Sequence, residues 1–393
     1  MIIVEKPKVK QNVNEIVISF TFSIDGLSQN LWYSVPLEYK EYLVIERLDT
    51  ALVGLLFLGL QRGEDIHIKG GISSRLFYTL NHYLIDALVL GNKNFQKIKI
   101  SAEELNSSSL NVGNIAGTGL SCGIDSLATY FNHSTEKEPF AIEYFTFFNV
   151  GSHGDFGGDK SRRIFNRRLR AVEKFAHREG KKIIPVDSNL SEILRMNFQQ
   201  THTLRNVCAV LLLQKLFKNY YYASAYRLDY FRLNPFDTSD SDIFNLSMLS
   251  TESTAIFSSV ANMTRIERTE LVSQRSETYD ILDVCTNLEE NAEVLNCTNC
   301  EKCLRTALTL DLLGKLNLYE RVFDLKKYKV QKDAYVGKLL STKKSSLLNR
   351  EICDLLYEKD EIKLKHFYFA ANSLSNRKIK VVKNFFKKYL TYG

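Results

Sequence analysis

The stretch Leu120-Ser121-Cys122-Gly123-Ile124-Asp125-Ser126 decides the fold class expected for this chain. It follows a predicted strand over residues 114–120 and opens a predicted helix over residues 124–132. A small turn that contains glycine leaves several backbone N–H groups unpaired, and the helix dipole adds partial positive charge at the same place. An anion is therefore the expected occupant, with hydroxyl groups supplied by Ser121 and Ser126. A serine-rich turn before an ordinary helix is the alternative interpretation.

The spacing Ser-x-Gly-x-Asp-Ser differs from the Gly-x4-Gly-Lys-Ser/Thr pattern of the common phosphate-binding loop. It resembles the pyrophosphate loop of the ATP-pyrophosphatase (PP-loop) superfamily, whose pattern is Ser-Gly-Gly-x-Asp-Ser. Members of that superfamily split ATP into AMP and pyrophosphate. Cys122 stands where the superfamily has its first glycine.

Four of the seven cysteines form a second motif, Cys-x11-Cys-x2-Cys-x2-Cys, within nineteen residues. They are Cys285, Cys297, Cys300 and Cys303. Four thiolates satisfy a tetrahedral zinc ion, and two-residue gaps let neighbouring sulfurs converge on one metal. Buried or disulfide-bonded cysteines are the alternative, which fits badly because the sequence shows no secretory signature. We therefore predict a structural zinc site.

Together, the two motifs make the chain resemble the 7-cyano-7-deazaguanine synthase family, ATP-dependent enzymes on the path to queuosine. That family carries a pyrophosphate loop followed by a four-cysteine zinc site. Weaker similarities lie at residues 148–153 (family Asp-Tyr-Gly-Gln-Arg-His), 204–206 (family Pro-x-Arg-Asn) and 299–305 (family Gly-x-Cys-x-x-Cys-x-x-Arg). The resemblance covers about residues 113–315. The family's Gly-Tyr-Pro-Asp-Cys segment has no clean counterpart, the nearest stretch being residues 234–240, so the substrate does not carry over.

The resemblance implies an ATP-dependent adenylating C–N ligase that releases AMP and pyrophosphate. It activates a carboxylate, on a small molecule or a protein, for amide or nitrile formation. ATP, Mg²⁺ and Zn²⁺ are the implied cofactors. No glutaminase signature is evident, so free ammonia or an amine-bearing partner is the expected nitrogen donor.

Site residues follow from the two motifs and the resemblance. The residues assigned to nucleotide binding are Ser121, Cys122, Gly123, Ile124, Asp125, Ser126, Asn149 and Gly151. Asp125 is expected to orient the loop or hold Mg²⁺, with a helix N-cap as its alternative. Arg205 is expected to pair with a phosphate or the substrate carboxylate, with an ion pair at a helix start as its alternative.

Three further candidates are weaker. His153 and His202 are candidates for proton transfer, although a lone histidine is more often structural. Cys122 lies where a helix N-terminus favours a thiolate, yet a cysteine there also serves as a small substitute for glycine. Among the arginines of residues 162–170, most are expected to face solvent, and one is a candidate for reaching the triphosphate.

Composition sets limits on the class of protein. The chain has 393 residues, 45% of them hydrophobic and 11% aromatic, which is typical of a folded globular protein. No apolar run reaches the length of a membrane span, so we expect a cytoplasmic protein without a membrane partner. The net charge of +7 is concentrated in residues 324–393, which hold 17 Lys or Arg against 7 Asp or Glu. Nucleic acid is a candidate partner for this segment, with a solvated helical face as the favoured alternative.

The element pattern predicts an α/β fold with a doubly wound parallel sheet and three regions. Residues 1–112 form an α+β unit for substrate recognition or dimerisation. Residues 113–315 form the nucleotide-binding core with the zinc site, and residues 316–393 a basic, mainly helical extension. In the first region we predict strands at 16–22, 31–35, 66–68 and 95–100 and helices at 52–60 and 73–90; in the core, strands at 114–120, 143–149, 182–187 and 220–224 and helices at 124–132, 161–179 and 203–217.

Two other functions remain open at this level. A PP-loop enzyme that modifies tRNA or a nucleobase would use the basic C-terminal segment, although no paired catalytic cysteine is obvious outside the zinc motif. A non-catalytic nucleotide-binding module in a defence or biosynthetic complex would keep the loop without turnover. The change to Cys122 and the missing pocket segment slightly favour this last reading.

Overall fold

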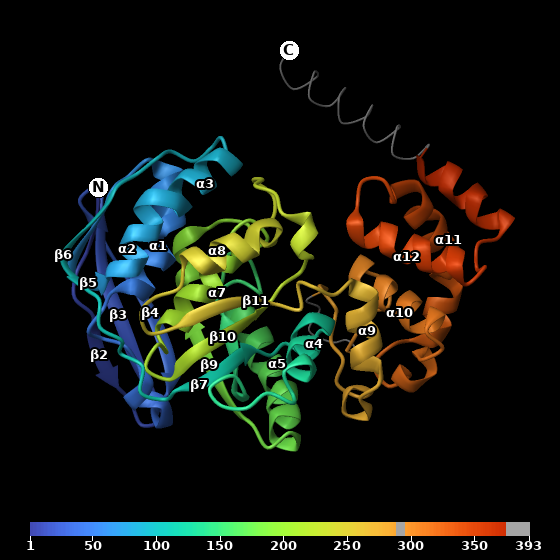
Figure 1. The fold of residues 1–393 in the computed structure, drawn as a ribbon, viewed down its shortest axis with the longest axis horizontal. Helices are drawn as coiled ribbons and strands as arrows, with labels where there is room; N and C mark the ends of the chain where they lie inside the picture. Colours follow the sequence, from blue (N-terminus) through green and yellow to red (C-terminus); the bar gives the residue numbers. More distant parts are fainter. Residues whose placement is uncertain (288–294, 375–393) are drawn as a thin grey trace, which may run out of the picture. The chain divides into compact units, whose positions relative to one another are not determined.

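The computed structural model describes residues 1–287 and 295–374, which form a mixed α/β protein (Figure 1). The described residues group into two compact units. The first contains residues 1–121 and 125–262, and the second contains residues 122–124 and the described part of 263–393. This division by compactness does not test the three regions predicted from the sequence, so the boundaries of those regions stay predictions.

Five parallel strands form one half of an eleven-stranded sheet in the first unit. They are β7 (Ile115–Gly119), β8 (Ile142–Asn149), β9 (Lys182–Ser188), β10 (Phe217–Ala223) and β11 (Ala255–Ser259). Their spatial order is β11-β10-β7-β8-β9, and every neighbouring pair is parallel. Numbered from β7, this is the order 3-2-1-4-5 of open doubly wound sheets. The predicted core strands and their parallel pairing are confirmed.

The N-terminal strands continue the same sheet. They are β1 (Ile2–Val4), β2 (Lys8–Gln11), β3 (Glu15–Ile24), β4 (Leu27–Pro36), β5 (Ile66–Ser73) and β6 (Ile100–Asn106). Strand β4 pairs antiparallel with β9, with Tyr33 opposite Ser188, so the edge of the parallel half is covered. The predicted β3–β4 hairpin is confirmed, and both turn residues, Asp25 and Gly26, have positive φ.

One predicted strand is wrong. Residues 95–99 form a loop, and β6 begins only at Ile100, where the prediction ended. The Phe95 ring lies 5.5 Å from the Phe57 ring on helix α1 (Asp49–Arg62), and the Gln96 N–H donates to the carbonyl of Leu60 at 2.8 Å. The apolar residues of this segment are therefore buried against a helix without pairing in the sheet.

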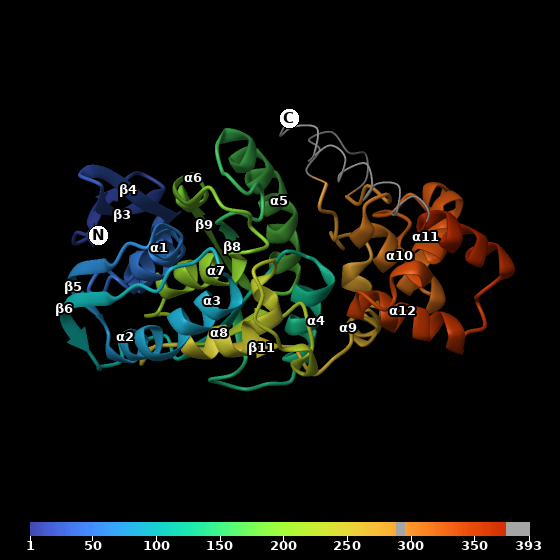
Figure 2. The ribbon, with the colours of Figure 1, turned by 90° about the horizontal axis from the view of Figure 1, so that it is seen from above.

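Separate helices cover the two faces of the parallel half (Figure 2). On β8, Phe145 and Phe147 contact Phe175 and Phe165 of helix α5 (Asp159–Arg178). The alternate residue Phe148 belongs instead to the core cluster that contains helices α1 and α7 (His202–Leu211). Successive strand residues point to opposite faces, so the sheet is packed on both sides. The other helices of the first unit are α2 (Ser74–Thr79), the π-helix η2 (Leu80–Leu84), α3 (Ile85–Gly91), α4 (Ile124–Asn132), α6 (Leu190–Leu194), α8 (Asp242–Met248), and the 3-10 helices η1 (Leu37–Tyr42), η3 (Leu228–Tyr230) and η4 (Thr238–Ser241).

The second unit is helical in its described part. Its helices are α9 (Arg265–Ser273), α10 (Glu301–Leu312), α11 (Leu325–Thr342) and α12 (Leu347–Glu358), with the 3-10 helices η5 (Ser276–Thr278) and η6 (Leu316–Tyr319). Side chains cap α11 and α12: Asp324 accepts from the Lys327 N–H at 3.0 Å, and Ser346 accepts from the Asn349 N–H at 3.3 Å. The described residues from 316 to 374 are mainly helical, whereas their being a separate extension stays a prediction, and residues 375–393 lie outside the described residues. Within the described ranges, every helix is too short or too polar to cross a bilayer.

Candidate functional site

The loop of residues 120–126 lies at the carboxyl end of β7, the central strand of the parallel half. From β7 the chain continues to β8 on one side, and it later returns to β10 on the other side. The strand order therefore reverses at β7. Open α/β sheets bind ligands outside the carboxyl ends of the strands at such a reversal.

Two serines meet in this loop. The backbone N–H of Ser121 donates to Oγ of Ser126 at 3.3 Å, and the two Oγ atoms are 3.2 Å apart. Ser126 is buried and Asp125 lies in the first turn of α4, which begins at Ile124. The N–H of Leu120 donates to the carbonyl of Thr146 at 2.9 Å and anchors the loop to β8. The structure thus places two hydroxyl groups side by side at the N-terminus of α4. This helix has nine residues, long enough for its dipole to favour an anion there.

Cys122 has a left-handed backbone conformation, with φ of 56°. Residues with a side chain rarely adopt this region, whereas glycine enters it without strain. Glycine would therefore adopt the conformation of residue 122 without strain. The Cys122 side chain is buried, and its carbonyl accepts from the Asp283 N–H at 2.9 Å within the second unit. Burial favours the interpretation of this cysteine as a small substitute, and its role in catalysis stays a prediction.

We expect Cys122→Val to destabilise the protein by about 1–3 kcal/mol, since a β-branched side chain is poorly tolerated at positive φ. Cys122→Gly is the matched control, because it removes the backbone strain while losing only a small buried side chain. Thermal unfolding of the three proteins measures the difference. Equal melting temperatures for the Val and Gly variants would contradict the left-handed conformation of the loop.

The predicted adenine-binding residues lie at the carboxyl end of the adjacent strand β8. Nδ2 of Asn149 donates to Oδ1 of Asp187 at 2.7 Å, which holds the end of β8 against β9. Gly151 has φ of 131°, and a Cβ atom there would lie 2.4 Å from Cδ2 of Phe198. Only glycine fits this position. The structure thus brings residues 149–151 to the same sheet edge as the serine loop, and their contact with adenine stays a prediction.

Arg205 is buried, and its guanidinium group holds the loop after β8. Nη1 donates to the carbonyls of Val150 (3.3 Å) and Asp155 (3.2 Å) and to Oγ of Ser191 (3.1 Å). Nη2 donates to the carbonyl of Met196 at 2.7 Å. Burial lowers the arginine's pKa to about 10, so the group stays protonated at neutral pH. These contacts give Arg205 a positioning role, while its predicted pairing with a substrate anion stays untested.

The two histidines have different surroundings. His153 is buried, with ring centroids 5.1 Å from Phe147 and 5.4 Å from Phe165, and burial lowers its pKa to about 3. A histidine that stays neutral inside an aromatic cluster is typical of a structural residue. His202, the first residue of α7, instead contacts a phenol and a carboxylate: Nδ1 lies 2.7 Å from Oη of Tyr222 and Nε2 lies 3.2 Å from Oδ1 of Asp237.

The sequence analysis missed the partners of His202. Asp237 belongs to the segment 234–240, which was noted only as an imperfect counterpart of a family motif, and Tyr222 was counted only within a predicted strand. Asp242, at the start of α8, adds a fully buried carboxyl group whose Oδ1 accepts from Oγ1 of Thr203 at 2.6 Å. Burial raises the pKa of Asp242 to about 7, and the charges of Asp237 and Asp240 add to this shift.

We expect the free energy of unfolding to fall as pH rises from about 5 to 7 and to level off above pH 7, because Asp242 is protonated in the folded state and ionised in the unfolded state between its two pKa values. A carboxyl group whose folded pKa is raised gives its full stability at low pH and loses it as pH rises through the folded pKa. Asp242→Asn mimics the protonated group and should reduce the decline by an amount on the order of 3 kcal/mol. Urea unfolding at pH 5, 6.5 and 8 measures it. An identical decline in the variant would contradict the assignment.

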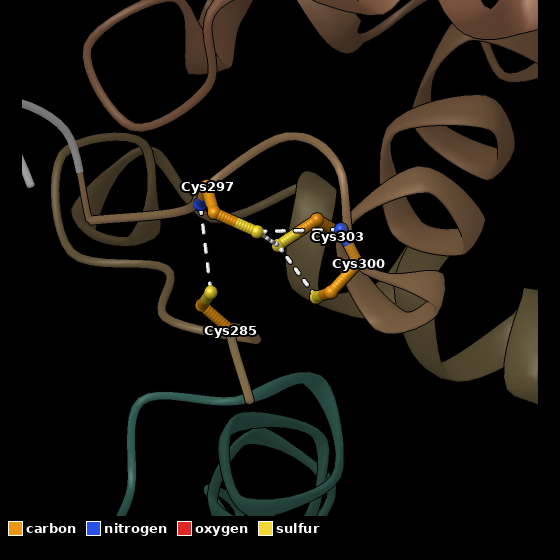
Figure 3. A group of neighbouring side chains, drawn as sticks. All are labelled: Cys285, Cys297, Cys300 and Cys303. Carbon is orange, nitrogen blue, oxygen red and sulfur yellow. Dashed lines mark hydrogen bonds between the residues drawn. The ribbon is translucent and has the colours of Figure 1, made fainter. Parts of the chain in front are cut away.

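The four predicted cysteine ligands come together in the second unit (Figure 3). The sulfur atoms of Cys285, Cys297, Cys300 and Cys303 all lie within 4.8 Å of one another. Two sulfur–sulfur distances are 3.3 Å (Cys300 and Cys303) and 3.9 Å (Cys297 and Cys303). A tetrahedral zinc ion with Zn–S bonds of about 2.3 Å requires about 3.8 Å between sulfurs. The cluster therefore has dimensions that can hold a metal ion such as zinc.

The groups around the four sulfur atoms stabilise the charged thiolate form of the cysteines. The N–H of Asn287 donates to Sγ of Cys285 at 3.3 Å, and the N–H of Cys300 donates to Sγ of Cys297 at 3.3 Å. Cys303 lies in the first turn of α10, where the helix dipole favours negative charge. Hydrogen bonds to sulfur and a helix N-terminus both lower the energy of a charged ligand set.

Buried Asn296 organises the backbone around the cluster. Its Nδ2 donates to the carbonyls of Leu282 (2.7 Å) and Val322 (3.0 Å), and its Oδ1 accepts from the N–H of Val284 at 2.9 Å. One side chain thereby joins the segment before Cys285 to the segment before α11. Sequence reasoning did not single out Asn296, because its role depends on chain segments that are far apart in the sequence.

Fold and cluster define a mixed α/β protein with a large, mostly parallel sheet and a four-cysteine group able to bind a metal ion. No protein-family model, no curated protein and no solved structure matches this chain. The function therefore has to be argued from the residues of the site.

Proposed function

We propose that the protein is an ATP-dependent adenylating enzyme of the PP-loop type. In this proposal a substrate carboxylate attacks the α-phosphorus of ATP, pyrophosphate leaves, and the acyl-adenylate is converted to an amide or a nitrile. The resemblance to 7-cyano-7-deazaguanine synthase suggests this chemistry, and a different carboxylate, on a small molecule or a protein, is the expected variation.

The observation that carries the proposal is the contact between Ser121 and Ser126 in the turn from the central strand to α4. A pyrophosphate group needs donors that converge on its oxygens, and the two hydroxyls and the N–H groups of the helix N-terminus meet this need. Asp125, in the same first turn, is the residue proposed to hold Mg²⁺, which would neutralise charge on the phosphates.

Residues around the loop hold this arrangement in place. Arg205 fixes the segment after β8 through backbone carbonyls, and Asn149 fixes the end of that strand. In-line attack on phosphorus depends mainly on positioning, so a rigid sheet edge favours it. The cysteine cluster is proposed as a structural zinc site, because four thiolates leave no coordination position for a substrate.

Nucleotide product analysis tests the proposal. The zinc-loaded protein is incubated with Mg²⁺, ATP, ammonium and 7-carboxy-7-deazaguanine, beside Asp125→Ala and the control Asp159→Ala. Asp159 is an exposed residue in the first turn of another helix, α5. We expect AMP and pyrophosphate that depend on the acid, are lost in Asp125→Ala and are retained in Asp159→Ala.

Other products would identify a different function. Formation of ADP, or ATP bound without turnover for a panel of carboxylates, would contradict adenylation and identify a nucleotide-binding module. Turnover that requires tRNA and falls steeply with salt would identify the RNA-modifying alternative.

A further inference from the structure

His202, Tyr222 and Asp237 form a continuous hydrogen-bonded chain in the first unit. The imidazole lies between the phenol, 2.7 Å from Nδ1, and the carboxylate, 3.2 Å from Nε2. In the tautomer with a proton on Nε2, the ring donates to Asp237 and accepts from the Tyr222 hydroxyl. The side chains of His202 and Asp237 are 12% and 14% exposed, so each keeps a small solvent-accessible surface.

The surroundings of this chain are rich in acceptors. Asp240 and Asp242 are both buried, and among the described residues Oδ1 of Asp240, Oδ2 of Asp242 and Oδ1 of Asn245 have no hydrogen-bond partner. The protonated Asp242 can itself donate through Oδ2, so the unpaired acceptors are Oδ1 of Asp240 and Oδ1 of Asn245. Buried acceptors normally have a donor, so these two atoms indicate a missing one. Arg232 and Asn234 occupy the other oxygen of Asp240.

The groups around His202 carry a net charge that is negative or zero. Burial opposes ionisation of Asp237, but the hydrogen bond from His202 holds the pKa of Asp237 below its usual range. Burial and the charge of Asp242 raise the pKa of the Tyr222 phenol, so it keeps its proton at neutral pH. The titratable and charged groups that face His202 are Tyr222, Asp237, Asp240, Asp242 and, through Asp240, Arg232.

The sheet places this chain next to the serine loop. Strands β7 and β10 are parallel neighbours, with Thr118 opposite Tyr221. Tyr222, one residue further along, is therefore level with Gly119, where the loop begins. Paired strands are about 4.8 Å apart, so the backbone of Tyr222 lies one strand from the place proposed for the reacting ATP, while its side chain projects to the face covered by α7.

We propose that His202, Tyr222 and Asp237 bind and deprotonate the nitrogen donor, a protonated primary amine or ammonium ion. This inference rests on the proposed function, since it assigns the second half of that reaction. Carboxylate oxygens attract the ammonium group, and hydrogen-bond acceptors match its N–H donors.

The proton follows the hydrogen-bonded chain. One proton passes from R–NH₃⁺ to Oη of Tyr222 while the Tyr222 hydroxyl proton passes to Nδ1 of His202, and Asp237 stabilises the imidazolium. The freed lone pair then forms a C–N bond to the acyl carbon. The bond from that carbon to the phosphate oxygen breaks, and AMP leaves with the electron pair. The nitrogen's second proton is lost to water.

Two partial reactions, measured separately, distinguish this inference from the proposed function. Exchange of labelled pyrophosphate into ATP, driven by 7-carboxy-7-deazaguanine, measures adenylation without an amine. Amide formation with ammonium or glycinamide measures the amine step. We expect Tyr222→Phe to lower amide formation about 10²–10³-fold while lowering exchange far less, since removal of a proton-transfer group has that effect on the step it serves.

Tyr221→Phe is the matched control. Its hydroxyl donates to the carbonyl of Phe140 at 3.0 Å on the opposite face of the same strand, so both rates should be retained. Tyr222→Phe should also change the pH profile of amide formation, which a purely structural role would leave unchanged. Equal losses in exchange and amide formation for Tyr222→Phe would overturn the inference.

A binding measurement tests the inference even if 7-carboxy-7-deazaguanine drives no exchange of pyrophosphate into ATP. We expect methylammonium to shift the ring ¹⁵N resonances of His202 in a saturable manner, and Asp237→Asn to abolish the shift. Absence of a saturable shift in the unsubstituted protein would overturn the amine site whatever the outcome for adenylation. Absence of exchange together with a saturable shift would instead reject adenylation of this acid and retain the amine site.

Discussion

Cys303→Ser should abolish stable metal binding and unfold much of the second unit. Structural zinc in small domains contributes about 10–16 kcal/mol of apparent binding free energy, all of which is coupled to folding. Cys303 is buried in the first turn of α10, and its sulfur lies 3.3 Å from that of Cys300, so its loss removes a central ligand. Metal content, together with limited proteolysis of the second unit, measures the effect.

Cys353→Ser is the matched control for that experiment. Cys353 is also buried in the second unit, on α12, but it stands outside the cluster. We expect this variant to retain one equivalent of zinc and the protease resistance of the unsubstituted protein. A Cys303→Ser protein with the same metal content and resistance as Cys353→Ser would contradict the metal site.

Local patterns in the sequence predicted the parallel half of the sheet well. The apolar residues of strand β8 and helix α4 follow an uninterrupted pattern that is bounded by turn residues, and both elements occur as expected. Of the N-terminal strands, β3, β4 and β5 were predicted, while β1, β2 and β6 were missed. Their continuation of the same sheet was also missed, because the β4–β9 pair joins residues about 150 positions apart. No local pattern encodes such a pairing.

The same limit applies to the site. The four cysteines were found because the spacing typical of a metal-binding group is visible in the sequence. Arg205 was predicted to pair with a phosphate or the substrate carboxylate, which stays a prediction. Its four acceptors are distributed over residues 150–196 and define a positioning role only in the folded chain. Tyr222 and Asp237 were missed for the same reason, since α7, β10 and the segment before α8 bring them to His202.

Ser126→Ala should reduce adenylation about 10²–10³-fold while lowering the free energy of unfolding by only about 1 kcal/mol. The activity loss corresponds to removal of one donor preorganised for a transition-state oxygen. The stability loss is of the size expected for neutral hydrogen bonds at one hydroxyl, which here include the bond from the Ser121 N–H at 3.3 Å and the contact with Oγ of Ser121 at 3.2 Å. Pyrophosphate exchange and urea unfolding measure the two quantities on the same preparation.

Ser134→Ala and a double variant make this prediction specific. Oγ of Ser134 donates to the carbonyl of Phe131 at 2.8 Å just beyond the other end of α4, so its loss should cost similar stability without affecting exchange. Oγ of Ser121 lies 3.2 Å from that of Ser126, and groups that act on one ligand are not additive, so the double variant should lose less than the product of the single losses. Parallel losses in Ser126→Ala and Ser134→Ala would show that the pair only supports the helix. A selective, non-additive loss would mean that both hydroxyls act on the same phosphate group, which is the arrangement that the reversal of strand order at β7 favours.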